Sequence, residues 1–319
     1  YKQYGLKINN IPNRFGFYLD NILYLKKNSK KIDILNLYHV DRISFFQSIV
    51  YKIFNHRGKL YIKMDCDKND FDRIYMSKFK RYVIFYTLYN LANLITVESS
   101  SVLDYIHVLG FKKVKYLSNG FDINYITDSP NFSKENIILT VGRIGTYQKA
   151  TDFLLNSLIP FFKNNREWKL YLVGPIETNF NKFIENFFLQ NPDLKDSIIF
   201  FGEISDKQSL MRIYQKSKIF VLPSRFESFG LVLLEALANG CYLVMSDSIP
   251  PAKDLLVQKI NGTTFQCENS LNLYTTLNSS LENCLYSNEN NLRRINFVKE
   301  KYDWNILVKQ LYRDLEENL

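Results

Sequence analysis

The sequence predicts an α/β protein with two Rossmann-like, doubly wound domains that face a cleft. Its 319 residues, 46% of them hydrophobic, supply apolar material for two domains rather than one. Short apolar runs alternate with stretches of helical apolar spacing, which is typical of parallel sheets covered by helices. The alternation breaks at 122–135, where Pro and Ser gather, and then starts again. We therefore expect domains at 1–128 and 129–303, followed by a helix over 304–319.

The first half predicts four strands and three helices. KIDILNLYH, 31–39, is a short apolar run that favours a buried parallel strand. The segment 100–110 has a Ser at its start and a Gly at its end, as helix capping requires. We expect strands over 31–39, 59–65, 93–99 and 113–122, and helices over 41–54, 79–92 and 100–110.

The second half repeats this pattern and ends in an amphipathic segment that starts at Trp304. Thr151 or Asp152 is expected to cap the first helix after the linker. Tandem domains of this kind bind a ligand at the carboxyl ends of their strands, in the cleft. We expect strands over 136–144, 169–175, 197–204, 218–224 and 241–247, and helices over 151–162, 179–190, 207–217, 229–240 and 251–258.

The net charge of +9 lies entirely on the first half of the chain. Residues 1–128 carry 20 Lys and Arg against 11 Asp and Glu, whereas 129–319 carry 21 of each. Such a one-sided field suits an anionic membrane surface, a polyanionic substrate or nucleic acid, and a solvated Lys-rich surface is the plain alternative. Because no nucleic-acid motif accompanies the charge, we do not expect nucleic acid as a partner.

Cysteine spacing and hydropathy predict a cytoplasmic protein. Cys66, Cys241, Cys267 and Cys284 lie far apart, without the spacing of a metal site or of a disulfide framework. No run of about 18 apolar residues occurs. The nearest, 82–97, contains two Asn residues and is expected to be a helix that runs into a strand. The protein is expected to lie on the inner face of a membrane without spanning it.

The segment 223–240, PSRFESFGLVLLEALANG, carries the clearest chemical signal. Glu227 lies in the loop after a strand, and a helix is expected to begin near Ser228–Gly230. The free N–H groups of a helix start suit a phosphate or a sugar hydroxyl, and Gly230 lets a ligand approach the backbone. Glu235 is able to accept two hydrogen bonds from a ribose diol. The alternative, that both glutamates only favour the helix dipole, leaves the strand, turn and glycine unexplained.

A second segment, 141–155, places Arg143 and Lys149 between a strand and a helix. Arg offers a fork of donors and Lys a point charge, so together with a helix start they suit a diphosphate. The glycines at 142 and 145 do not have the spacing of a phosphate-binding G-x-G-x-x-G or Walker motif. Alone this segment is equally compatible with a solvated loop, but the glutamates of the same sheet strengthen it.

These motifs resemble the GT-B glycosyltransferases of family 4, over nearly the whole chain and most clearly at 138–248. The similar segments are ILTVGRI with YQKATDFLL, LYLVGP, FFGEIS and the Glu-x7-Glu block ESFGLVLLEALANG. SNGFD, 118–122, resembles the turn that closes the N-terminal domain, and the helix from Trp304 resembles the one that packs back on that domain. The resemblance implies the GT-B fold and transfer of a sugar from a nucleotide-diphosphate sugar with retention of configuration.

The resemblance also implies a role for each matching residue. Arg143 and Lys149, next to Gly142, neutralise the leaving diphosphate, and Glu235 holds the ribose hydroxyls. Glu227 holds the donor sugar together with the backbone of Ser228, Phe229, Gly230 and Leu231. Val173, Gly174 and Pro175, with Gly202, Glu203 and Ile204, line the base pocket. The expected co-substrate is a UDP- or GDP-sugar, and no cofactor or metal is expected.

The first half departs from the family pattern. It lacks the opening strand and Gly-rich loop of the family and is short, which implies a truncated or abridged N-terminal domain. Where the family has a histidine near the reacting carbon, this chain has Asp65, which we assign to that place. Asp65-Cys66-Asp67 also matches the Asp-x-Asp motif of metal-dependent enzymes, but Arg143 and Lys149 make a metal redundant. His39 ends a strand at the expected cleft, where it is able to touch the acceptor, but the favoured interpretation is a histidine that is satisfied in the interior or at the surface.

The predicted function is transfer of a sugar to a saccharide or lipid-linked saccharide hydroxyl in the assembly of bacterial capsule, exopolysaccharide or lipopolysaccharide. The basic first half is expected to dock on an anionic membrane surface. Two alternatives share the fold: a nucleotide-sugar epimerase or phosphorylase, and a non-catalytic partner subunit that keeps the fold for binding. Nucleotide binding and product analysis distinguish them.

Overall fold

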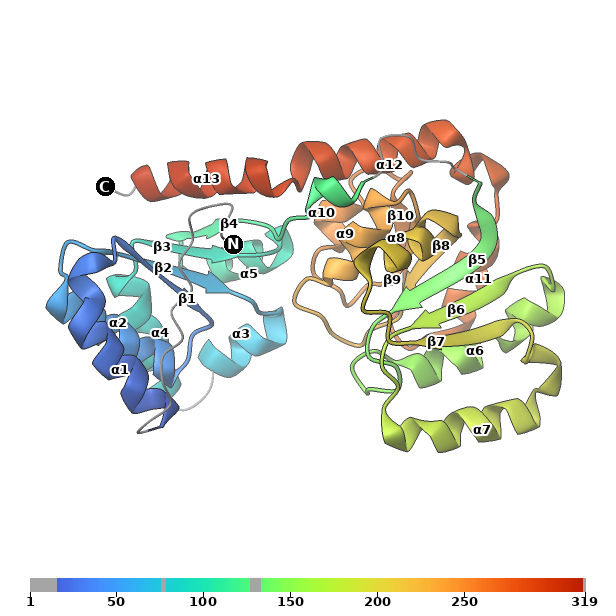
Figure 1. Ribbon diagram of the computed structural model, residues 1–319, viewed down its shortest axis with the longest axis horizontal. Coiled ribbons are helices and arrows are strands. Elements are labelled where there is room, and N and C mark those ends of the chain that lie inside the picture. The colour runs from blue at the N-terminus through green and yellow to red at the C-terminus, as the bar shows by residue number, and fades with distance from the viewer. Residues whose placement is uncertain (1–15, 76–78, 127–132, 318–319) are drawn as a thin grey trace. The chain divides into compact units, whose positions relative to one another are not determined.

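The structure is a computed structural model that describes residues 16–75, 79–126 and 133–317. The chain divides into two compact α/β units (Figure 1). Unit 1 comprises Tyr1–Val97, Tyr105–Tyr116 and Asp314–Leu319, and unit 2 comprises Glu98–Asp104 and Leu117–Arg313. The predicted domain boundary after residue 128 lies outside the described residues, as does the middle of the predicted linker. In the described part, no helix is both long and apolar enough to cross a bilayer.

Unit 1 is built on a parallel sheet of four strands in the order β1-β2-β3-β4. The order advances in one direction only, so this sheet corresponds to one half of a doubly wound sheet. The strands are β1 (Ile34–Tyr38), β2 (Lys59–Met64), β3 (Leu94–Val97) and β4 (Val114–Tyr116), and the helices are α1 (Phe17–Asn28), α2 (Arg42–Phe54), α3 (Lys68–Tyr75), α4 (Phe79–Leu91) and α5 (Ser100–Val108), whose first turn belongs to unit 2.

Local signals explain several of these elements. The carboxylate of Asp41 accepts a hydrogen bond from the backbone N–H of Ser44 at 2.7 Å and starts α2. The hydroxyl of Ser99 accepts from the N–H of Val102 at 3.3 Å, so the cap of α5 is the serine one position before the predicted segment 100–110. Residues 82–97 form most of α4 and then β3, as predicted. The observed β4 is shorter than the predicted strand over 113–122, because the segment turns at Ser118 and beyond.

Unit 2 is built on a six-stranded parallel sheet in the order β10-β9-β8-β5-β6-β7. The order reverses between β5 and β8, which are paired neighbours, so this sheet is doubly wound. The strands are β5 (Glu135–Val141), β6 (Lys169–Val173), β7 (Ile198–Gly202), β8 (Ser217–Leu222), β9 (Tyr242–Ser246) and β10 (Gly262–Phe265). The helices are α6 (Thr151–Asn164), α7 (Asn181–Gln190), α8 (Lys207–Lys216), α9 (Leu231–Ala238), α10 (Ala252–Leu255), α11 (Ser270–Ser279), α12 (Asn288–Lys301) and α13 (Trp304–Glu316).

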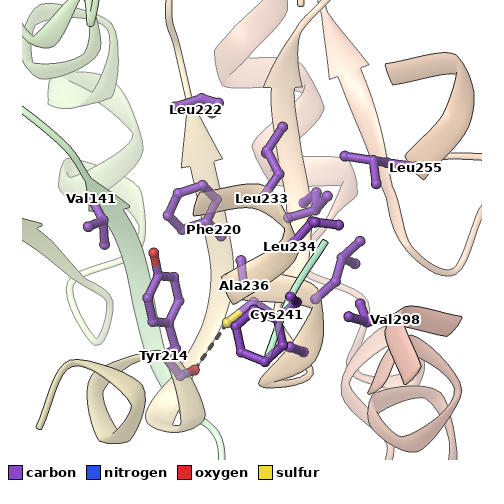
Figure 2. Packing of buried hydrophobic residues seen from close by; sticks show 14 of the residues in the cluster. Val141, Tyr214, Phe220, Leu222, Leu233, Leu234, Ala236, Cys241, Leu255 and Val298 are labelled. Carbon is purple, nitrogen blue, oxygen red and sulfur yellow. Dashed lines mark hydrogen bonds between the residues drawn. The ribbon is translucent and has the colours of Figure 1, made fainter. Parts of the chain in front are cut away.

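Two apolar layers cover the faces of the sheet of unit 2. One layer packs α8, α9 and α12 on the sheet, and the other packs α6, α7 and α11 (Figure 1). Figure 2 shows Phe220 and Leu222 of β8 beside Leu233 of α9 in the first layer. The thiol of Cys241 donates to the backbone carbonyl of Tyr214 at 3.0 Å in the same layer. Burial on both faces explains why these strands are continuous apolar runs.

Some predicted boundaries and caps were wrong. Helix α9 begins at Leu231 rather than at Phe229, because Gly230 adopts a left-handed φ of 79° and ends the preceding loop. Neither Thr151 nor Asp152 caps α6; the cap position is Ala150, at φ 50°, without a side-chain cap bond. The structure also contains α3, α11, α12 and β10, which the sequence pattern did not predict. The helix predicted from Trp304 is α13.

The last residues of α13 belong to unit 1. There the ammonium of Lys115, on β4, contacts the carboxylate of Asp314 at 2.8 Å and that of Glu317 at 3.0 Å. The ammonium of Lys59, at the start of β2, donates to the backbone carbonyl of Leu315 at 3.0 Å. These contacts attach the end of α13 to the sheet of unit 1.

Candidate active site

Two loops lie side by side where the sheet of unit 2 reverses its order. Loop 142–150 follows β5, and loop 223–230 follows β8. The backbone N–H of Arg225 donates to the carbonyl of Gln148 at 2.9 Å, so the loops are joined directly. In doubly wound sheets a ligand binds at this reversal, outside the carboxyl ends of the strands. Both segments with the predicted cations and glutamates therefore meet at the expected place.

Glu227 and Lys149 are in direct contact across the two loops. The ammonium of Lys149 forms an ion pair with Oε1 of Glu227. The same oxygen accepts from the hydroxyl of Ser224 at 2.8 Å, and Oε2 accepts from the amide of Gln148 at 3.3 Å. Glu227 is only 6% exposed, and these partners offset the cost of burying its carboxylate. An ammonium has three donors, which leaves Lys149 able to bind a further anion.

Arg143 joins this cluster through Gln148. Its guanidinium donates to Oε1 of Gln148 at 3.1 Å, while the amide nitrogen of Gln148 donates to Glu227. Arg143 itself is exposed, so several of its five donors face solvent. The sequence analysis did not single out Gln148, although it directly precedes Lys149. The cluster at the loops thus contains Arg143, Gln148, Lys149, Ser224 and Glu227.

Glu235 belongs to a separate cluster on α9. Its Oε1 forms an ion pair with the ammonium of Lys207, at the start of α8, and its Oε2 accepts from the hydroxyl of Tyr214 at 2.9 Å. Burial, and next the neighbouring charge of Glu235, raise the pKa of Tyr214, so its hydroxyl remains a donor. Lys207 also lies 5.9 Å from the ring centre of Tyr125. The sequence analysis missed Lys207 and Tyr214, because nothing in their spacing links them to Glu235.

Three glycines lie at the carboxyl ends of the adjacent strands β5, β6 and β7, namely Gly142, Gly174 and Gly202. The N–H of Gly142 donates to the carbonyl of Val173 at 2.9 Å, and the N–H of Gly174 donates to that of Gly202 at 2.8 Å. A β-carbon on Gly174 would overlap the carbonyl oxygen of Gly142, whereas one on Gly202 would meet no atom within 4 Å. These strand ends therefore form a backbone surface that a flat ring is able to approach.

The remaining residues predicted for the donor are placed as follows. Val173 is buried in the core, Ile204 is half-buried against it, and Pro175 and Glu203 are exposed. Phe229 is 1% exposed and packs in the core, so only its backbone is able to meet a ligand. Ser228 is half-buried and Leu231 is exposed.

The start of α9 carries no side-chain cap. Gly230 is its cap residue and has no side chain to accept from the first N–H groups, although its backbone carbonyl accepts from the N–H of Leu233 at 2.9 Å. Such N–H groups lack partners within the helix and carry its positive dipole end, so they favour an anion or a hydroxyl. Because Glu227 lies in the loop that leads into Gly230, the start of α9 and the charged cluster are on the same short segment of the chain.

Asp65 lies in unit 1, directly after β2, and is exposed. It borders a pocket of about 330 Å³ whose other lining residues are His39, Val40, Met64, Cys66, Asp70 and Arg73. His39 follows β1 and adopts a left-handed φ of 68°. The pocket therefore lies at the carboxyl ends of β1 and β2, where parallel sheets place their ligands.

The second carboxylate of the Asp65-Cys66-Asp67 motif has a structural task. Oδ1 of Asp67 accepts a hydrogen bond from the backbone N–H of Asp70 at 2.7 Å, as a cap of α3 does. Burial raises the pKa of Asp67, although the N–H bond acts in the opposite direction. A carboxylate that already caps a helix is poorly suited to be one of the two aspartate ligands of a metal ion.

The chain is similar to known proteins over most of its length. A family model described as glycosyl transferases group 1 matches residues 122–296, more than half of the chain. An uncharacterized glycosyltransferase of Methanocaldococcus jannaschii is 26% identical over 292 residues, which cover 86% of this chain and 70% of that protein.

Two further matches have more specific names. A transferase of Campylobacter jejuni, named for adding N-acetyl-D-galactosamine to an undecaprenol-PP-linked saccharide, is 25% identical over 194 residues. That match covers 60% of this chain and half of the relative's length. The structure of Anabaena HepE in complex with UDP and glucose superposes with a TM-score of 0.74 at 17% identity, over 99% of this chain and 87% of HepE.

Proposed function

Because this chain belongs to the glycosyl transferases of group 1, we propose that it moves a sugar from a nucleotide-diphosphate sugar to an acceptor hydroxyl. The observation that carries the proposal is the charged cluster at the strand reversal, where Lys149 contacts Glu227 and Arg143 is joined to both through Gln148. A cluster with two cations beside an uncapped helix start is suited to a diphosphate.

Each part of the cluster has a distinct task in this reaction. Arg143 and Lys149 bind the oxygens of the diphosphate and stabilise the negative charge that grows as the bond to the sugar stretches. Glu227 holds Lys149 in place and accepts hydrogen bonds from hydroxyls of the donor sugar. Glu235, fixed by Lys207 and Tyr214, keeps lone pairs that are able to accept the ribose hydroxyls. A β-carbon on Gly202 would meet no atom within 4 Å, so this glycine leaves room for the base.

The transfer itself breaks one bond and forms one. The bond between the anomeric carbon and the diphosphate oxygen breaks, and its electron pair stays on the diphosphate. The acceptor oxygen then bonds to the anomeric carbon on the same face, and its proton moves to a diphosphate oxygen. This route retains the configuration and needs no separate protein base. In unit 1, Asp65 and His39 border the pocket that we assign to the acceptor.

Binding and product analysis test this function. Calorimetric titration with UDP and with GDP is expected to show saturable binding of at least one, and Glu227→Gln is expected to weaken turnover far more than nucleotide binding. A radiolabelled nucleotide sugar then shows the fate of the sugar. Transfer to a saccharide supports the proposal, an epimerised donor indicates an epimerase, and no binding of either nucleotide indicates a non-catalytic subunit.

The biological setting that we propose is the assembly of bacterial surface polysaccharide on a lipid-linked acceptor. The Campylobacter relative is named for an undecaprenol-linked acceptor, and unit 1 carries the basic half of the chain. An acceptor of that kind is presented at the inner face of the cell membrane, which a cytoplasmic enzyme reaches by docking on the lipid surface. A peripheral attachment of this kind is electrostatic and therefore sensitive to salt.

Helices α1 and α2 offer a surface for this attachment. They pack on each other, and Gln47 of α2 donates to Asn21 of α1 at 3.4 Å (Figure 1). On α2, Phe46 and Ile53 are 51% and 68% exposed and share one face with the exposed Arg42. On α1, Leu19 and Leu23 share a face with Lys26, and all three are exposed. Cations with apolar side chains between them suit an anionic bilayer surface.

Vesicle sedimentation tests this surface. Vesicles that contain phosphatidylglycerol are expected to bind the protein, and 1 M salt is expected to release it. Arg42→Gln combined with Lys26→Gln is expected to weaken binding about thirtyfold, since each basic residue contributes roughly 1 kcal/mol at such a surface. The control is Arg293→Gln, which removes an exposed arginine of unit 2. Equal binding to neutral vesicles, or release by detergent only, contradicts an electrostatic attachment.

A further inference from the structure

Arg225 lies beside the candidate site, and each of its three guanidinium nitrogens donates a hydrogen bond to the protein. It is not one of the cations assigned to the donor. It lies in loop 223–230, two residues before Glu227. Its side chain is only 11% exposed, although it carries a full charge. Burying a guanidinium at this level is costly unless each donor has a partner. The partners therefore indicate what the residue does.

The guanidinium of Arg225 contacts two acidic residues, one on a loop and one on a helix. Its Nε donates to Oε1 of Glu268 at 2.7 Å, in the loop between β10 and α11. Its Nη1 and Nη2 donate to the two carboxylate oxygens of Asp152, in the first turn of α6, at 3.4 and 3.3 Å. Burial alone would lower the pKa of Arg225, but the hydrogen bonds that it donates to Glu268 and Asp152 raise it, so the group remains charged.

Arg225 also holds the loop that contains Lys149. Its Nη1 donates to the backbone carbonyl of Tyr147 at 2.7 Å, and the ring centre of Tyr147 lies 4.3 Å from the guanidinium carbon. The N–H of Arg225 donates to the carbonyl of Gln148 at 2.9 Å. The residue therefore bonds the two positions that directly precede Lys149.

These contacts require an arginine. A planar guanidinium is able to bind Asp152 with two parallel bonds, reach Glu268 with its third nitrogen and stack on Tyr147 at the same time. A lysine carries its charge at one point and cannot satisfy this geometry. Because Nε, Nη1 and Nη2 all have protein partners, Arg225 differs from Arg143, whose guanidinium is exposed.

We propose that Arg225 is a positioning residue for the donor diphosphate, since it fixes loop 142–150 against loop 223–230 and so sets where the ammonium of Lys149 lies relative to Glu227. The inference rests on the proposed function of the charged cluster. Arg225 touches neither the sugar nor the diphosphate in this scheme. It acts through Lys149, and its loss leaves the nucleoside part of the site unchanged.

This role makes a prediction that a purely structural role does not. A nucleoside diphosphate meets Lys149 and Arg143 with its terminal phosphate, whereas a nucleoside monophosphate ends one phosphate earlier. If Arg225 positions Lys149, removing it weakens the diphosphate selectively. If Arg225 only stabilises the fold, both nucleotides weaken together or neither weakens.

The experiment measures the ratio of UDP to UMP affinity, or of GDP to GMP affinity if the guanine nucleotides bind, by calorimetry on the full chain. Arg225→Met is expected to lower the ratio about tenfold, which corresponds to about 1.4 kcal/mol. Arg225→Lys, which keeps the charge, is expected to recover only a small part. Glu268→Gln leaves the arginine in place and is expected to lower the ratio by a smaller factor. The matched control is Arg293→Met, which breaks an exposed ion pair with Glu289 on α12.

A double-mutant cycle with Lys149 decides how Arg225 acts. In a Lys149→Met background, Arg225→Met is expected to cause no further fall in the ratio, since the group that it positions is gone. An unchanged ratio in Arg225→Met and in Glu268→Gln, even with a lower unfolding midpoint, overturns the inference. If Arg225→Met does not fold, Glu268→Gln alone decides between these outcomes. Absence of any nucleotide binding in the unsubstituted protein overturns the proposed function and this inference together.

Discussion

The two edges of the sheet in unit 2 both carry clustered cations, but the partners of those cations differ. At the carboxyl edge, Lys149 and Arg143 bond side chains that lie on loops. At the amino edge, Lys134 donates to the backbone carbonyls of Tyr214, Ser217 and Asn239 at 3.1, 2.8 and 2.7 Å. The cations at the carboxyl edge are thus able to exchange their partners for a ligand, whereas the cation at the amino edge keeps its partners.

Arg294 shows the same behaviour at the amino edge. Its guanidinium is fully buried and donates to the carbonyls of Ile260 and Gly240 at 2.7 and 3.1 Å and to Oδ1 of Asn291 at 2.9 Å. Burial is the main cause that lowers the pKa of Arg294, to about 10. Backbone carbonyls at helix ends and in the connections to strands do not move aside for a ligand, whereas loop side chains do. Clustered charge therefore marks a binding site only where the partners are displaceable.

The largest effect is expected at the carboxyl edge, in Lys149→Met. Removing an ammonium that stabilises the leaving diphosphate is expected to lower turnover about 10²–10³-fold. Turnover of a labelled nucleotide sugar measures it. Lys163→Met, an exposed lysine at the end of α6, is the control. Turnover within twofold of the unsubstituted protein would remove Lys149 from the mechanism.

The amino edge is expected to respond in stability instead. Arg294→Met leaves several buried carbonyls without a donor and is expected to lower the free energy of unfolding by about 3 kcal/mol. Urea titration followed by far-UV circular dichroism measures it, and Arg293→Met on the same helix is expected to change it by less than about 0.5 kcal/mol. A normal stability combined with lost nucleotide binding would show that the two edges are not separate in function.

Glu235→Gln is expected to have an intermediate effect on donor affinity. The neutral amide is a weaker acceptor for ribose hydroxyls and leaves Lys207 without its counter-charge, so nucleotide affinity is expected to fall about tenfold. Tyr214→Phe removes only the hydroxyl that donates to Glu235 and is expected to cause a smaller loss in the same direction. Calorimetry with the preferred nucleoside diphosphate measures both. Equal affinity in all three proteins argues against a ribose at Glu235.

A pH dependence of stability is expected at Lys134. Burial, as the main cause, lowers the pKa of Lys134 from 10.5 to about 8. The unfolded chain therefore binds more protons than the folded one between these values, and stability rises with pH there. This contribution is present above pH 10.5 and is lost as the pH falls through about 8. Urea titrations across this range are expected to show the rise in the unsubstituted protein but not in Lys134→Met; parallel curves contradict it.

Much of the fold was predictable because its strands are continuous apolar runs and its helices are amphipathic. The helices predicted at 41–54 and from Trp304, and the helix-to-strand run at 82–97, are all observed. Helix α12 was missed because its sequence, NENNLRRINFVKEK, is mostly polar, and Arg294 occupies a core position that a hydrophobic pattern does not reveal. Strand β10 was missed because four residues, GTTF, are too short to show a period.

The partners of the candidate site residues were less predictable. Glu227, Arg143 and Lys149 were found because each follows a strand, and parallel strands end at one edge of the sheet. Gln148, Lys207, Tyr214 and Arg225 were missed because their contacts join segments 21 to 79 residues apart. The pairing of β5 with β8 brings Gln148 and Arg225 together, whereas Lys207 and Tyr214 meet Glu235 where α8 lies against α9.

By itself, the sequence determined which residue types follow each strand and that two parallel α/β units form, because apolar period and helix start signals are local properties of the chain. Only the tertiary structure decided that Glu227 pairs with Lys149 while Glu235 pairs with Lys207, and that Arg225 closes the two loops. The physical reason is that hydrogen bonds and ion pairs act over a few ångströms in space, and distance in space follows from strand order, which local spacing does not encode.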